Sequence, residues 1–382
     1  MFLGIRELVF ARGRFILMGT VVALISLLMV MLSGLSRGLV NDGVSGLMRM
    51  PVSHFAFEGG TKLDSAFSRS TVTSAQAAEW AKRDDVAEAA LFGNELVNAA
   101  MQRGPGERPL PLDLALFGVE PEGWLAPAVA AGTRLGADAR GIVVSSTVAE
   151  LGVGIGDVIA IDRLGTELTV VGITADQRTF GHVDVAYVPL RTWQEIHAGT
   201  VDGQPAAATA YEEATAVAVL ARSGAVVDVG AADAAAGTTT RTREDAFGAS
   251  PGYTAETTTL NLIQAFLYVI SALLIGAFFT VWTINRRHEL AVIRAMGATA
   301  GHLIRDTIGQ AAVVLLAATA VGVGAGVGAG ALLSGGAMPF ALEARPVAAS
   351  SALLVALGLL GAGAAAVRIA RVDPITALGG SR

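Results

Sequence analysis

Four long stretches of this chain carry no charged residue, and they constrain the fold more than any other feature of the sequence. They lie at positions 15–35, 262–284, 308–342 and 347–367. A helix needs about 20 consecutive apolar residues to cross a bilayer, and helices of soluble proteins seldom run so far without a charge. The chain is also 53% hydrophobic and only 16% charged. We therefore expect a membrane protein with four transmembrane α-helices rather than one large soluble enzyme.

Composition and missing motifs exclude several kinds of site. The chain contains no Cys, so disulfides, cysteine zinc sites and thiol nucleophiles are excluded. A net charge of −6 argues against nucleic-acid binding, which needs a basic surface. No phosphate-binding G-x-x-x-x-G-K-[ST] loop occurs, and the zinc pattern that starts at His288 and Glu289 fails at Val292. We expect no catalytic residues, no protein-held metal and no intrinsic cofactor.

The placement of charge predicts the orientation of the chain in the membrane. Arginine residues gather beside the four stretches, at Arg6, Arg12 and Arg14, at Arg286, Arg287, Arg294 and Arg305, and at Arg368 and Arg371. Positions 37–257 carry 16 basic and 28 acidic residues, against 11 and 5 in the rest of the chain. Cytoplasmic loops of membrane proteins are enriched in Arg and Lys. We therefore expect a multi-pass cell-membrane protein with both termini in the cytoplasm and the long acidic segment outside.

These features predict the order of segments along the chain. We expect a cytoplasmic amphipathic helix (1–14), transmembrane helix 1 (15–40), an extracytoplasmic domain (41–256), transmembrane helix 2 (257–284), a cytoplasmic helix (285–302), transmembrane helix 3 (303–335), an extracytoplasmic loop (336–346), transmembrane helix 4 (347–370) and a cytoplasmic tail (371–382). Alternating apolar residues at 54–58 and 182–190 predict strands, and Thr73 or Ser74 is expected to cap a helix. The large domain between helices 1 and 2 is therefore expected to be α+β.

Small residues recur at a spacing of four in the third and fourth stretches. Gly322, Gly326 and Gly330 follow this spacing, as do Gly358 and Ala362. Such spacing lets membrane helices approach closely. It predicts a contact between the third stretch and the first or second span, although a merely flexible helix would carry the same pattern.

The segment between the second and third stretches has the pattern of a short amphipathic helix. Its apolar ridge is Leu290, Ile293 and Met296, and its charged residues are Arg287, Glu289 and Arg294. Gly297 is expected to end the helix. A helix with a small apolar ridge suits a groove on a partner protein. The alternative is an interfacial helix that lies on lipid.

This segment resembles the FtsX-like permease family, the membrane half of macrolide-exporter-type ABC transporters. That family carries an R-x-E-[IL]-A-x-x-[KR]-A-[ML]-G-A run at this place. The matching residues are Arg287, Glu289, Leu290, Ala291, Arg294, Ala295, Met296, Gly297 and Ala298. The closing segment 368–378 resembles the end of the same family through Arg368, Pro374, Ala377 and Leu378. The order of one span, a large outer domain and three further spans also matches.

The resemblance implies a homodimeric permease that works with a separate cytoplasmic ATPase dimer, which would bind the ATP and Mg. The segment 286–298 would be the coupling helix seated in that ATPase. The residues implied in coupling are Arg287, Glu289, Leu290, Ile293, Arg294, Met296 and Gly297. The chain itself would be a transporter subunit in contact with membrane lipid and not an enzyme.

The first 39 residues resemble the opening of haem-export permeases of the HrtB type and of related cyanobacterial glycolipid exporters. The matching features are the initial Met-Phe-Leu, a basic amphipathic helix and a Leu-rich span that ends in Gly34-Leu35-Ser36-Arg37-Gly38-Leu39. This resemblance implies haem as the transported ligand, in a pump for haem efflux and detoxification.

A haem site can be drawn from the residues near the outer leaflet. Met31 and Tyr268 each lie 16 residues from the cytoplasmic end of their span, about 24 Å up at ~1.5 Å per residue. Met and Tyr are known haem-iron ligands. Met29 lies slightly closer to the cytoplasmic end of the span than Met31. Arg37 lies farther toward the outer surface, where a haem propionate would reach. The alternatives are that the methionines only pack and that the tyrosine belongs to an aromatic belt. Met29 and Met31 are also about 200° apart on a helix, so both cannot face one slot.

Two other functions fit the same architecture. A permease of this build could export a lipid, a peptide or an antibiotic. It could also transport nothing and instead transmit movement to a cell-envelope hydrolase.

Overall fold

The computed structural model describes residues 12–104, 106–136, 140–202, 204–285, 292, 296–297, 299–333 and 338–370. It divides into two compact units. One comprises residues 40–256, which we call the inserted domain. The other comprises residues 1–39 and 257–382, which we call the helical unit.

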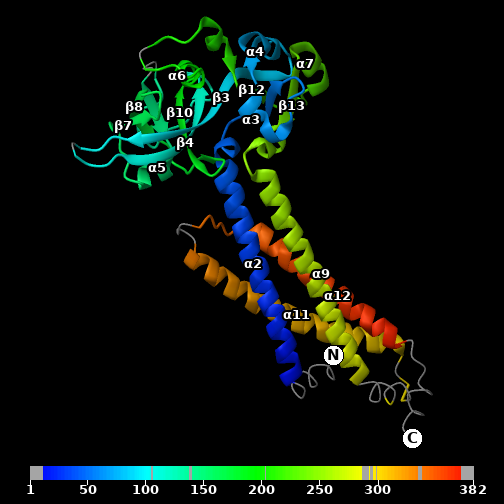
Figure 1. The fold of residues 1–382 in the computed structure, drawn as a ribbon. Helices are drawn as coiled ribbons and strands as arrows, with labels where there is room; N and C mark the ends of the chain where they lie inside the picture. The colour runs from blue at the N-terminus through cyan, green and yellow to red at the C-terminus, as the bar shows by residue number, and fades with distance from the viewer. Residues whose placement is uncertain are drawn as a thin grey trace. The chain divides into compact units, whose positions relative to one another are not determined.

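Four long helices account for the described part of the helical unit (Figure 1). They are α2 (Arg12–Met48), α9 (Tyr253–Asn285), α11 (Ala300–Leu333) and α12 (Ala344–Ala370). Among the described residues, these four helices are long and apolar enough to cross a membrane. This confirms the predicted architecture of four candidate membrane helices with a β-rich domain between the first and the second.

The helices α2 and α9 run past the predicted spans. α2 has 37 residues and is therefore about 55 Å long, whereas the hydrocarbon core of a bilayer is about 30 Å thick. Its last turns contain Val44 and Leu47, whose side chains are fully buried in the inserted domain. The same helix thus continues from an apolar stretch into the core of a folded domain, and that burial stabilises turns that hydropathy alone would not predict.

The inserted domain combines many short strands with short helices. Its strands are β1 (His54–Glu58), β2 (Val72–Thr73), β3 (Val86–Met101), β4 (Leu110–Val119), β5 (Ala131–Gly132), β6 (Gly141–Val144), β7 (Val158–Ile161), β8 (Glu167–Ile173), β9 (Thr179–Phe180), β10 (Val183–Pro189), β11 (Glu213–Ala214), β12 (Ala216–Ala221) and β13 (Thr238–Thr242). Its helices are α3 (Ala66–Arg69), α4 (Ser74–Ala81), α5 (Ser146–Glu150), α6 (Leu190–His197), α7 (Val229–Ala236) and α8 (Arg243–Ala246), with short 3-10 turns at Leu63–Ser65, Ala208–Glu212 and Phe247–Ala249. The predicted cap of α4 is present, because the Thr73 side chain accepts from the Gln76 backbone N–H and the Gln76 side chain accepts in return.

Eleven of the described strands form one sheet, in the order β13-β1-β12-β3-β4-β10-β6-β8-β5, with β7 and β9 beside this path. The long strand β3 is its centre. Its first half pairs antiparallel with β12, and its second half pairs with β4 and β7. The β4–β10 and β6–β8 pairs are parallel, so the sheet is mixed.

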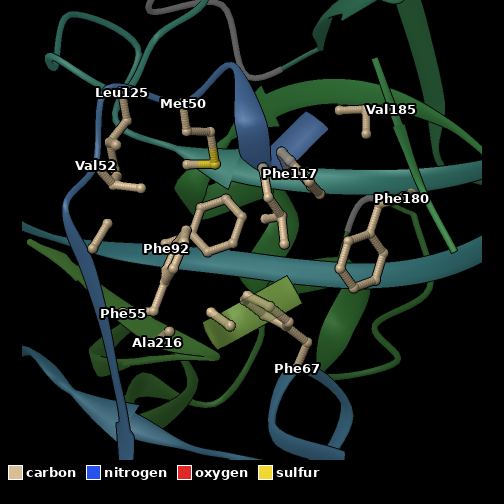
Figure 2. Close-up of a cluster of buried hydrophobic side chains, with 14 of the residues drawn as sticks. Met50, Val52, Phe55, Phe67, Phe92, Phe117, Leu125, Phe180, Val185 and Ala216 are labelled. Carbon is tan, nitrogen blue, oxygen red and sulfur yellow. The ribbon is translucent and has the colours of Figure 1, made fainter. Parts of the chain in front are cut away.

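The main core of the inserted domain is a cluster of aromatic rings (Figure 2). Phe55, Phe67, Phe92, Phe117 and Phe180 meet one another mostly edge to face, as Phe92 and Phe117 do with centroids 5.0 Å apart and planes at 83°. This geometry places the positive ring edge on the negative ring face, which stabilises such pairs beyond simple burial. The end of α2 belongs to the same cluster and is therefore part of the core of the domain.

Candidate functional site

The helices α11 and α2 meet along a seam of glycines. A Cβ built at Gly322 would lie 2.6 Å from Ser26 Cβ and closer still to the Ala23 carbonyl oxygen. A Cβ at Gly326 would lie 2.8 Å from Val30 Cβ. These glycines therefore let the two backbones touch, and the contact predicted from the four-residue spacing is made with the first span.

A second seam joins α12 to α9 and α11. A Cβ at Gly358 would lie 3.0 Å from Ile275 and 2.9 Å from Leu315, and a Cβ at Gly361 would lie 2.9 Å from the Ala272 carbonyl oxygen. Ala362 on the same helix is fully buried. Lipid tails are as apolar as Leu, so membrane helices associate through close contacts of this kind rather than through hydrophobic burial.

Aromatic rings join the beginning of α2 to the end of α9. The Phe15 ring lies edge to face on Trp282, with centroids 4.7 Å apart, and it also contacts Phe278 at 6.3 Å. The predicted coupling segment follows directly after α9. The aromatic contact therefore ties the end of α9 that carries this segment to α2.

Farther along α2, Phe340 packs where glycines leave space. Its ring occupies the space that a Cβ at Gly34 or Gly330 would need, and the Pro339 carbonyl oxygen does the same at Gly38. The Ala341 N–H donates to the Gly34 carbonyl at 3.0 Å. We predicted an extracytoplasmic loop at 336–346 but did not predict its contact with α2. The signal that we missed was Gly34 and Gly38, which share one helix face at a spacing of four.

The four candidate haem residues lie in different surroundings. Met29 is buried, at 2% exposure, whereas Met31 on the same helix and Tyr268 on α9 are half-buried. The Arg37 guanidinium pairs with the Glu343 carboxylate at 3.6 Å, and both side chains are about half exposed. Among the described residues, no hydrogen bond or ion pair joins any two of the four candidates.

Most of the predicted coupling residues, namely Arg287, Glu289, Leu290, Ile293 and Arg294, lie outside the described residues. Met296 is 76% exposed, and its N–H donates to the Val292 carbonyl at 3.0 Å. Gly297 follows with φ +103°, a conformation that favours glycine. Met296 and Gly297 therefore lie in a turn, and the prediction that Gly297 ends a helix concerns preceding residues that lie mostly outside the described ones.

Two apolar grooves run along the helical unit. One of about 1080 Å³ lies between α11 and α12, and one of about 580 Å³ lies between α2 and α11. None of Met29, Met31, Tyr268 and Arg37 lines either groove. Within the described part of the chain, no group of three or more His, Asp or Glu side chains is arranged to hold a metal ion.

Part of the helical unit matches a known protein family. Residues 261–374 match the FtsX-like permease C-terminal domain. The putative hemin transport system permease protein HrtB of Staphylococcus epidermidis is 28% identical over 146 residues, 38% of this chain and 41% of that protein. The HrtB protein of Staphylococcus haemolyticus is 32% identical over 131 residues, 34% of this chain and 36% of that protein. The chain thus spans about two fifths of the length of these curated relatives.

Solved structures of two outer domains also resemble part of the chain. The extracellular domain of the noncanonic ABC-type transporter YknZ from Gram-positive bacteria is 16% identical, with 50% of this chain and 98% of that chain covered and a TM-score of 0.33. The periplasmic region of MacB from Actinobacillus actinomycetemcomitans is 12% identical, with 51% and 91% covered and a TM-score of 0.35. The family match lies in the helical unit, where residues 261–374 match the FtsX-like permease C-terminal domain.

Proposed function

We propose that this chain is the permease subunit of an ABC-type exporter and is driven by a separate cytoplasmic ATPase. The observation that carries the proposal is the FtsX-like permease domain over residues 261–374. The absence of a phosphate-binding loop from the sequence agrees with ATP being bound by a partner. In the same proposal the chain works as a homodimer, with both termini in the cytoplasm and the inserted domain outside.

The helix contacts suggest how movement would pass through the subunit. The coupling segment 286–298 follows α9, whose end contacts the beginning of α2 through Trp282 and Phe15. At Gly322 and Gly326 the backbones of α2 and α11 come so close that no Cβ would fit between them. A push on the coupling segment would therefore move α2 and α11 together as one lever, because close-packed helices transmit displacement instead of absorbing it.

The ATPase assignment has a direct test. The purified chain in lipid nanodiscs is expected to hydrolyse no ATP, and hydrolysis should appear when its ATPase subunit is added. Hemin should then raise the rate of hydrolysis measured by phosphate release. ATP hydrolysis by the chain alone would contradict the proposal, whereas a hemin-insensitive complex would contradict only the choice of substrate.

We further propose that the exported ligand is haem, taken up beside Met31 and Tyr268. The support is the similarity of 146 residues to proteins named as hemin permeases and the accessibility of these two side chains, which are half-buried rather than sealed. Arg37 would receive a propionate after leaving Glu343. An exposed ion pair of this kind contributes only about 0–1 kcal/mol, so the exchange would cost little.

Replacing Met31 by Leu is expected to weaken hemin binding by about tenfold, because Leu keeps the volume of Met but removes the thioether ligand. The measurement is titration of the nanodisc-embedded chain with hemin, followed by the Soret absorbance. Met18→Leu is the matched control, since Met18 lies on the same helix and is buried in the core of the bundle at 4% exposure. Equal loss of affinity in both variants, or in neither, would exclude Met31 as a ligand.

A further inference from the structure

His182 lies between two carboxylates that come from the two helices leaving the inserted domain. Its Nδ1 is 2.8 Å from Asp42 Oδ2, and its Nε2 is 3.1 Å from Glu256 Oε2. Asp42 belongs to α2, and Glu256 lies in the first turn of α9. All three residues lie within the inserted domain. One imidazole ring therefore contacts both helices at once.

The chemistry of the ring makes this arrangement dependent on a proton. Carboxylates only accept hydrogen bonds, and a neutral imidazole has one N–H and one lone pair. Only the imidazolium form donates to Asp42 and Glu256 together. In the neutral form one ring nitrogen would direct its lone pair at a carboxylate, which is repulsive.

The segment that carries His182 is bound to α2 by other hydrogen bonds as well. The turn between β9 and β10 is fixed to α2 by neutral hydrogen bonds: Gly181 N–H donates to the Gly43 carbonyl at 2.9 Å, and the Thr179 hydroxyl donates to the Asn41 carbonyl at 3.1 Å. His182 follows Gly181 with φ +67°, a conformation that most residues avoid. The backbone therefore accepts strain to bring this ring to its position.

We propose that His182 is a proton-dependent clasp, which in its imidazolium form ties the first turn of α9 to α2 and in its neutral form releases Glu256. Asp42 would keep the remaining N–H, because its bond is the shorter one and Asp42 also receives a hydrogen bond from Gln177 at 3.4 Å. The pH on the side of the inserted domain would thus set how firmly α2 and α9 are held together. This proposal holds whichever substrate the protein transports.

The charged surroundings favour the imidazolium form. Partial burial lowers the pKa of His182, but the hydrogen bond that its ring donates to Asp42 and the charges of Glu256 and Asp42 raise it, and the pKa lies above its ordinary value of 6.5 on balance. Asp184 on β10 is acidic and therefore does not oppose a positive charge on His182. The guanidinium of Arg178, which precedes β9, donates to the Tyr187 hydroxyl at 2.9 Å. Since the pKa is raised on folding, the clasp is complete below about pH 6.5 and is lost as the pH rises through the higher folded value.

The test is hydrogen–deuterium exchange of the full chain in lipid nanodiscs, read on peptides that cover 253–258, at pH 6 and pH 9. At pH 6 the His182→Gln variant is expected to exchange about tenfold faster than the unaltered chain, because a charge-assisted hydrogen bond is lost. At pH 9 the two should exchange alike, since the clasp is already open. Comparison at equal pH removes the intrinsic effect of pH on exchange.

His197→Gln is the matched control. His197 also pairs with a carboxylate, Glu95 at 2.7 Å, but it lies on α6. Its replacement should leave exchange at 253–258 unchanged at both pH values. Equal exchange of His182→Gln and the unaltered chain at pH 6, or an equal effect of His197→Gln, would overturn the clasp.

If the His182→Gln variant does not fold, the proposal can still be tested on the unaltered chain. Its His182 ring can be titrated by nuclear magnetic resonance, and the isosteric Glu256→Gln variant should lower the midpoint of that titration. A midpoint at or below 6.5 in the unaltered chain, or one that Glu256→Gln leaves in place, would refute the proposal.

Discussion

Replacing Gly322 by Ala is expected to destabilise the helical unit by about 3 kcal/mol, because overpacking against a fixed neighbour is costly. The new Cβ would meet the Ala23 carbonyl oxygen and would lie 2.6 Å from Ser26 Cβ. A flexible side chain can turn away from such a clash, but a backbone carbonyl within a helix cannot. The two helices would have to separate, and the contacts along the α2–α11 seam would be lost. Thermal unfolding of the purified chain in detergent micelles measures this loss.

Gly324→Ala is the matched control for this experiment. The same substitution is made two residues along the same helix, where a Cβ would meet nothing within 4 Å. Ala favours a helix over Gly by up to about 1 kcal/mol, so this variant should be neutral or slightly more stable. Equal destabilisation by both variants would mean that glycine serves the helix itself rather than the seam.

Replacing Trp193 by Ala is expected to destabilise the inserted domain by about 4 kcal/mol, the range for removing a large buried aromatic ring. Trp193 on α6 is 1% exposed, and it covers Gly93 of β3 and Gly118 of β4. A Cβ at Gly118 would lie 2.5 Å from the Trp193 side chain. The two glycines thus form the floor on which the ring lies, and its removal leaves a cavity between helix and sheet. Chemical denaturation of the full chain in detergent, followed by far-ultraviolet circular dichroism, measures the effect.

A double variant tests whether the ring and its glycine floor act as one unit. Gly93→Ala alone should destabilise the domain by overpacking against the Trp193 ring, but in the Trp193→Ala background the added methyl group would fill part of the cavity that the ring leaves. The double variant should therefore cost less than the sum of the single variants, as residues in contact usually do. Val226→Ala, at a side chain that is 93% exposed, should change stability little. Strict additivity at Trp193 and Gly93 would contradict the packing of the ring on this glycine.

The surroundings of the candidate haem residues could be predicted only in part from the sequence. Hydropathy and helix periodicity placed Met29 and Met31 on opposite sides of one helix, and the structure adds that Met29 is the buried one. The sequence offered no reason to expect that Arg37 would pair with Glu343, because the two residues are far apart in the chain. The roles of these residues in haem binding stay predictions.

Much of the architecture was determined by the sequence alone. Uncharged stretches, a β-patterned segment between the first two, the four-residue spacing of Gly322 and Gly326, and a turn at Gly297 are all local signals. Each depends on a physical property that neighbouring residues share: the length that crosses a bilayer, the period of an element, or the conformational freedom of glycine. Local patterns of this kind can be interpreted without knowing what the rest of the chain does.

The tertiary structure alone decided which elements meet. The spacing of Gly322 and Gly326 predicted a close helix contact but left its partner open, and only folding selected α2. The extension of α2 to Met48, the packing of the Phe340 ring against Gly34 and Gly330, and the placing of His182 between Asp42 and Glu256 each join residues that are remote in sequence. Their common physical reason is that packing and charge pairing depend on distance in space, which no local period of the chain encodes.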